Sequence, residues 1–95
     1  MHVLRRRLAR MRGRVRECEA NGVGCRLYSR GATHYASASL LGEDCNTATG
    51  TGDTPELAVR LALERLALRN ADDPPLARRA LAAMPLLVRS ACYAR

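Results

Sequence analysis

The residues of this 95-residue sequence with the clearest chemical potential are arginines crowded near its start. Seven of its sixteen arginines lie between positions 5 and 16, and the chain contains no lysine. A guanidinium is a permanent, planar cation that pairs with carboxylates or phosphates through two parallel hydrogen bonds. We therefore expect the partner-binding site to consist of Arg5, Arg6, Arg7, Arg10, Arg12, Arg14 and Arg16.

The cysteines and histidines are too scattered to predict a metal site or a catalytic centre. Cys18, Cys25, Cys45 and Cys92 include no close pair of the kind that is typical of structural zinc sites, so we expect reduced, partly buried thiols. Neither histidine belongs to a recognisable nucleophile motif. The sequence predicts a protein that is not an enzyme and that holds neither a metal nor a cofactor.

The arginine cluster needs an element that presents it to a partner. From Leu4 to Cys18 an apolar residue recurs at spacings of 4, 3, 4 and 3, which predicts a helix over residues 3–19 with one buried stripe. Arginines four positions apart repel one another on such a helix, and a partner of opposite charge would relieve that repulsion.

Other interpretations of this segment stay open. The arginines can form a solvated face in a sequence that is rich in arginine throughout, or belong to an organellar transit peptide. The apolar stripe can also join two copies of the chain into a homodimer, which would concentrate the arginine surfaces.

The middle of the chain predicts an antiparallel sheet. Asn21-Gly22, followed by Gly24, is expected to end the first helix, because both residue types tolerate the left-handed backbone of a helix C-terminus. Alternating polarity between turn residues then predicts three strands. These cover residues 25–29, 34–41 and 46–51.

A second helix has the strongest local signal in the chain. Thr54 suits the N-cap, Pro55 the first helical position and Glu56 the positive end of the helix dipole. We expect this helix to run to residue 69 and to lie beside the first helix on one face of the sheet. The fold class is then α+β, in the order α-β-β-β-α.

The C-terminal part predicts a further short helix. Residues 70–75 should stop the second helix, and a third should cover residues 76–84, where Pro85 ends or kinks it. We expect a core domain over residues 1–70 and a helical extension over 71–95 that packs on it. An exposed apolar stripe for a partner is the alternative for this extension.

The order of elements and several short motifs resemble a double-stranded-RNA-binding domain, from about residue 4 to residue 68. The motifs are Tyr28, Gly31-x-x-His34, Gly50-x-Gly52 and Ala58-x-x-x-Ala62. In that family the loop with Gly-x-x-His enters a minor groove. The resemblance implies that Gly31 and His34 provide a secondary contact, together with the neighbouring Tyr35.

The same resemblance implies a phosphate grip that this sequence does not carry. The family's lysines at the start of the last helix fall on Pro55, Glu56 and Val59. An acidic residue then stands where a phosphate would lie. The resemblance therefore supports the architecture more than the RNA-binding activity.

Residues 47–66 are similar to small phage proteins called ABA-sandwich domains, without their usual tryptophan. This resemblance implies a phage-type accessory protein or an inhibitor of a host protein complex, for example an anti-CRISPR. We expect the arginine-rich helix to meet an acidic surface of a host protein. The alternative is a nucleic-acid-binding protein that contacts the phosphates of duplex or structured RNA or DNA with the same helix.

No secretory signal and no membrane span is predicted, because arginines interrupt every apolar run near the start of the chain. We expect a cytoplasmic protein with no membrane partner, in a bacterial host if it is phage-encoded.

Overall fold

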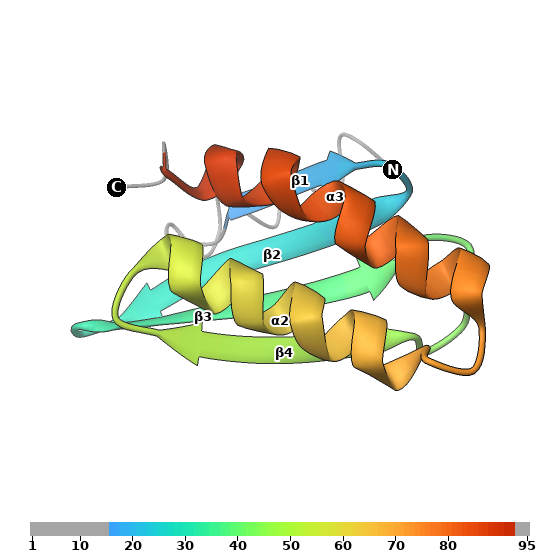
Figure 1. The fold of residues 1–95 in the computed structure, drawn as a ribbon. Coiled ribbons are helices and arrows are strands. Elements are labelled where there is room, and N and C mark those ends of the chain that lie inside the picture. The colour runs from blue at the N-terminus through green and yellow to red at the C-terminus, as the bar shows by residue number, and fades with distance from the viewer. Residues whose placement is uncertain (1–15, 93–95) are drawn as a thin grey trace.

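The computed structural model describes residues 16–92 of the chain. Four strands come first and two helices follow (Figure 1). The strands are β1 (Arg16–Ala20), β2 (Val23–Arg30), β3 (Thr33–Leu40) and β4 (Thr47–Gly52), and the helices are α2 (Pro55–Arg69) and α3 (Pro74–Cys92). The fold class is α+β, as the sequence predicts.

The four strands form one antiparallel sheet in the order β1-β2-β3-β4. Two-residue turns join β1 to β2 and β2 to β3, and residues 41–46 join β3 to β4. The β1–β2 turn is Asn21-Gly22, where both residues have positive φ, as the type I′ hairpin requires. The β2–β3 turn is Gly31-Ala32, with positive φ at the glycine alone, which matches type II′. Both turn types follow the twist of the strands, so they determine the register of β1, β2 and β3.

Helix α2 begins and ends as its sequence signals predict. The Thr54 hydroxyl accepts a hydrogen bond from the Leu57 N–H at 3.2 Å, and Pro55 lies in the first turn. At the other end Asn70 is buried, and its side-chain amide donates to the Leu66 carbonyl at 2.7 Å.

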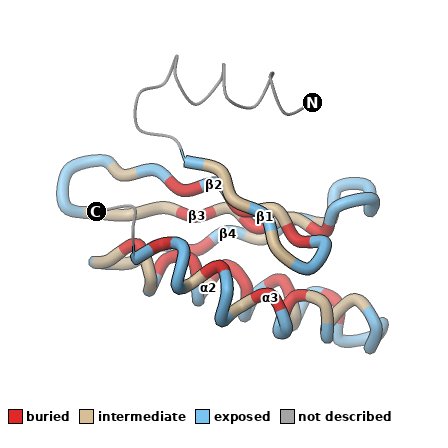
Figure 2. Tube along the Cα trace, turned by 90° about the horizontal axis from the view of Figure 1, so that it is seen from above, coloured by how far each residue is buried: buried red, intermediate tan, exposed pale blue. Residues whose placement is uncertain are grey.

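Both helices cover the same face of the sheet, so the protein has two layers (Figure 2). The hydrophobic core lies between these layers, and its buried members are all aliphatic apart from one cysteine. The sheet contributes Val23, Cys25, Leu27, Ala36, Ala38 and Leu40, and the helices contribute Ala58, Val59, Ala62, Leu63, Leu66, Ala80, Ala83, Leu87 and Ala91. The many alanines bring the helices close to the sheet and to each other.

The predicted first helix over residues 3–19 is wrong over residues 16–19. These residues belong to β1, and the sheet has four strands where three were predicted. Positive-φ residues serve helix ends and hairpins alike, and here Asn21-Gly22 makes a hairpin. The rest of that predicted helix lies outside the described residues.

The C-terminal helix is also longer than predicted. Helix α3 has 19 residues and continues through Pro85, which neither ends the helix nor leaves a tail after it. Its sheet-facing side buries Leu87, whereas Leu81 is 51% exposed. The second helix on the sheet is therefore α3, in the place predicted for the first helix.

Candidate binding surface on the sheet

The face of the sheet opposite the helices is covered by no element of the described chain (Figure 2). Side chains alternate across a strand, and the buried rows of β2 and β3 face the helices, so the residues between them point outward. We call this outward side the open face. It consists of Glu17, Glu19, Gly24, Arg26, Tyr28, Arg30, Thr33, Tyr35, Ser37, Ser39, Thr47, Thr49 and Thr51.

A stacked pair of tyrosines lies in the middle of the open face. Tyr28 on β2 and Tyr35 on β3 are directly opposite in the register. Their ring centroids are 5.1 Å apart and the ring planes differ by 12°. Such an offset pair contributes about 0.5–1.5 kcal/mol beyond the area it buries, so each ring holds the other in place. Tyr28 is still 41% exposed.

Arginines flank this tyrosine pair on the same strand. Arg26 and Arg30 stand two positions before and after Tyr28, so all three side chains share the open face, and both arginines are exposed. Small hydroxyl side chains surround them on β3 and β4. Ser39 and Thr47, for example, share a hydrogen bond of 2.7 Å. The open face therefore offers two rigid aromatic rings, two cations and a border of hydroxyl groups.

The net positive charge of the chain does not come from residues 16–92. Residues 16–92 contain nine arginines and nine acidic residues, which gives a net charge of zero. The formal charge of +7 comes from the six arginines of residues 1–15 and from Arg95. On the open face itself, Glu17 and Glu19 balance Arg26 and Arg30. The charged segment and the sheet surface are thus two chemically different parts of the protein.

Most of the predicted arginine site lies outside the described residues. Only Arg16 falls within them, as the first residue of β1 and not on a helix. Its register partner is the buried Leu27, so Arg16 lies on the helix-facing side of the sheet.

The predicted secondary contact does not form one surface. Gly31 lies in the exposed β2–β3 turn. His34 is half-buried in the row that faces the helices, whereas Tyr35 points to the open face. Among these three residues only Tyr35 belongs to the candidate binding surface.

Arg26, Tyr28 and Arg30 were not predicted as a binding site. A signal for them existed in the polar and apolar alternation of Val23–Arg30, because residues two apart on a strand share a face. Two isolated arginines in a strand are a much weaker signal than six arginines within residues 1–15.

Two motifs of the RNA-binding resemblance have a packing role here. A Cβ atom on Gly50 would lie 2.5 Å from the Ala58 carbonyl oxygen and 2.5 Å from the Ala62 nitrogen. The glycine and the two alanines therefore let β4 and α2 approach at backbone distance. At the start of α2, Pro55 and Val59 are buried, so these two lysine positions could not present a cation to a phosphate.

Several helical arginines support the fold instead of facing a partner. Arg65 and Arg69 on α2 donate hydrogen bonds to the carbonyls of Thr49 and Cys45. Arg79 on α3 donates to the Gly22 carbonyl at 2.6 Å and to the Leu41 carbonyl at 2.9 Å. It thereby ties the β1–β2 turn to the end of β3.

Within residues 16–92, no group of three or more histidine, cysteine, aspartate or glutamate side chains could hold a metal ion. All four cysteines lie within these residues, and none forms a disulfide there. Neither described helix is long and apolar enough to cross a membrane.

Comparisons of this chain with protein-family models, curated protein sequences and solved structures find no match.

Proposed function

We propose that this chain is a non-enzymatic binding protein that docks on a partner protein through the open face of its sheet. The observation that carries this proposal is the stacked Tyr28–Tyr35 pair between two exposed arginines, on a face that no described element covers. Tyrosine and arginine are the residue types enriched in binding hot spots. A tyrosine that is already held by its neighbour loses little side-chain entropy on binding.

The charge balance of the open face favours a protein over a nucleic acid as its ligand. Surfaces that bind phosphates carry an excess of cations. Here Glu17 stands directly opposite Arg26, and Glu19 follows on the same edge strand. Paired charges of both signs suit the mixed surface of a protein.

The arginine-rich segment adds a second contribution in this proposal. Residues 1–15 contain six arginines and no acidic residue, and they join the sheet at β1. Clustered cations accelerate association with an acidic surface, and each guanidinium can pair with a carboxylate. An inhibitor or accessory protein of a host complex, of phage type and for example an anti-CRISPR, is the specific form that the sequence resemblance suggests.

Nucleic-acid binding is the second candidate function, and the same six arginines favour it. A segment of this charge binds duplex or structured RNA or DNA through phosphates, with a log–log salt slope of about −0.9 per phosphate on duplex DNA. The neutral sheet would then contribute little to affinity.

The two candidates are separated by capture experiments with the full chain. Tagged protein is incubated with lysate of a bacterial host, with and without nuclease, and retained proteins and nucleic acids are identified. We expect one protein complex in both conditions. Nucleic acid alone, released by moderate salt, would support the second candidate instead.

Variants then locate the surface. Arg26→Ser with Arg30→Ser changes the open face, and Arg60→Ser with Arg89→Ser is the matched control at two exposed positions on the helices. Loss of a hot-spot residue costs about 2 kcal/mol or more, which is roughly a 30-fold weaker affinity. We expect this loss for the open-face variant only. Equal binding by both variants would refute the open face as the site.

A further inference from the structure

Two cysteines lie directly opposite each other in the sheet. Cys18 on β1 and Cys25 on β2 are register partners, and both side chains point to the helix-facing side. Opposed residues of antiparallel strands have Cα atoms about 4.5–5.5 Å apart. A disulfide spans Cα atoms roughly 4.4–6.8 Å apart. The strand register therefore places the two Cα atoms within the range that a disulfide can span, although both cysteines are free thiols in this structure.

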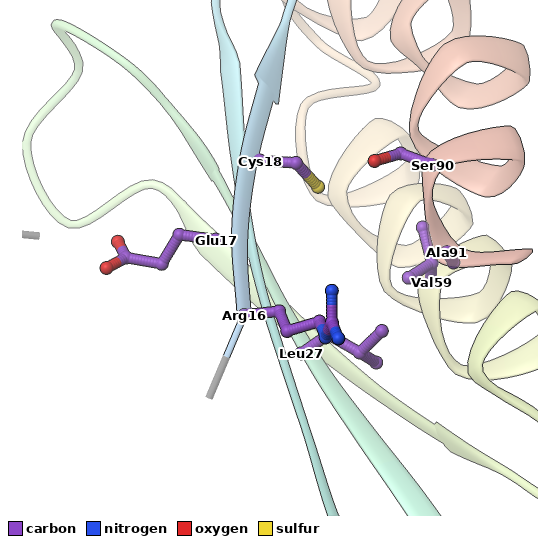
Figure 3. A pocket seen from close by; sticks show the side chains of 7 residues that line it. All are labelled: Arg16, Glu17, Cys18, Leu27, Val59, Ser90 and Ala91. Atoms are coloured by element: carbon purple, nitrogen blue, oxygen red, sulfur yellow. The ribbon is translucent and has the colours of Figure 1, made fainter. Parts of the chain in front are cut away.

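The two thiols differ in their access to a reagent. Cys25 is 2% exposed. Cys18 is half-buried and lines a partly open cavity of about 80 Å³ between β1 and the last turns of α3, with Arg16, Glu17, Leu27, Val59, Ser90 and Ala91. Its sulfur points toward the Ser90 hydroxyl, while the Glu17 carboxylate is turned away (Figure 3). A reagent can reach Cys18 first.

The two thiols also differ in protonation. The hydrogen bond from Cys25 lowers the pKa of Cys18 from 9.0 to about 7, against the opposing effect of burial and with a smaller contribution from Ser90. The interaction with Cys18 raises the pKa of Cys25, and burial raises it further. Near neutral pH a substantial part of the accessible sulfur is therefore thiolate, the nucleophilic form, while its neighbour holds the proton.

We propose that Cys18 and Cys25 form a thiol–disulfide exchange site, with Cys18 as the attacking and Cys25 as the resolving residue. Its substrate class is a small anionic disulfide, because the Arg16 guanidinium lines the same cavity and can pair with a carboxylate. This site lies on the helix-facing side of the sheet and does not depend on the function proposed for the open face.

The exchange has two steps. The Cys18 thiolate attacks one sulfur of the small disulfide, that S–S bond breaks, and one small thiolate leaves with Cys18 in a mixed disulfide. The Cys25 thiol then loses its proton to the departing thiolate and attacks the Cys18 sulfur. The second small thiolate leaves and takes a proton from solvent. The protein is oxidised by two electrons, and the small disulfide is reduced to two thiols.

The other two cysteines, Cys45 and Cys92, lie in different surroundings from the proposed pair. The Cys92 thiol donates a hydrogen bond to the Glu56 carboxylate at 3.2 Å. Cys45 is exposed in the connection between β3 and β4, outside the strands of the sheet. Cys45→Ser with Cys92→Ser therefore gives a background protein in which only the proposed pair can react.

The test treats this background protein with oxidised glutathione at neutral pH and measures intact mass. We expect loss of two hydrogens without a lasting adduct. With Cys25→Ser added, one glutathionyl group should accumulate on Cys18. With Cys18→Ser added instead, Cys25 should stay unmodified. Glutathionylation of Cys25 as fast as that of Cys18, or no reaction of the background protein, would overturn the proposal.

Two measurements keep the test valid if the Cys25 variant does not fold. In the background protein, alkylation of Cys18 should precede that of Cys25, with a half-maximal rate near pH 7. In urea this preference should disappear. Arg16→Ser should slow the reaction with oxidised glutathione and leave that with uncharged hydroxyethyl disulfide unchanged, and equal slowing of both would remove the anionic substrate class from the proposal.

Discussion

Replacing Gly50 by alanine tests how closely the helix layer rests on the sheet. Gly50 is buried on β4, and its φ lies outside the left-handed region, so an alanine meets no backbone strain there. The added Cβ would instead lie 2.5 Å from backbone atoms of Ala58 and Ala62 on α2. Carbon contacts are favourable at about 3.5–4.0 Å, so α2 has to move outward by about 1 Å.

The expected loss of stability follows from that displacement. A gap of about 0.5–1 Å removes a quarter to a half of the dispersion attraction across an interface. Overpacking costs about 1–3 kcal/mol, and we expect the upper end because helix backbone cannot rotate aside. Alanine also reduces the entropy of the unfolded chain, which offsets about 0.4–1 kcal/mol. The free energy of unfolding should therefore fall by about 2–2.5 kcal/mol.

Urea unfolding followed by circular dichroism measures this change, and Gly24→Ala is the matched control. Gly24 also lies in a strand, but an added Cβ there meets only the flexible side chain of Leu41, at 3.2 Å. We expect the control to change the free energy of unfolding by less than about 1 kcal/mol. Equal effects of the two substitutions would refute the close approach of α2 to β4.

Three further substitutions test other parts of the fold by the same unfolding measurement. Asn70→Ala should cost about 1–3 kcal/mol, because it removes the reciprocal amide hydrogen bonds of 2.7 and 2.9 Å with Asn46, and a neutral result would contradict their role. Pro85→Ala should stabilise the protein by about 1–3 kcal/mol and increase its helical signal, since proline interrupts the hydrogen bonds of α3 at an exposed position. Thr54→Ala should cost about 0.5–2 kcal/mol through loss of the N-cap bond to Leu57, whereas Thr54→Ser should retain most of it.

Local signals in the sequence were sufficient to predict the positions of several helices and strands. Helix α2 begins where the cap signal at Thr54 predicts. The strands predicted from alternation correspond to β2, β3 and β4. In each case the determining interactions lie within a few residues along the chain, as in a capped helix end or a two-residue turn. A linear sequence displays such interactions directly.

The β1–β2 hairpin and the length of α3 depended on contacts that form only in the folded chain. Asn21-Gly22 suits a helix end or a hairpin, and the hydrogen-bonded ladder between β1 and β2 decides for the hairpin. Pro85 stays within α3 because Ala83 and Leu87, two positions before and two positions after it, are buried in the core.

The same distinction between local sequence signals and tertiary contacts applies to the candidate sites. The sequence alone determined the high density of arginine in residues 1–15 and the small residues that let α2 pack closely. Only the tertiary structure decided that Tyr28 stacks on Tyr35 and that Cys18 lies opposite Cys25. In each pair the two residues are seven positions apart in sequence, and the register of their strands brings them together. A shift of that register by one residue would separate them.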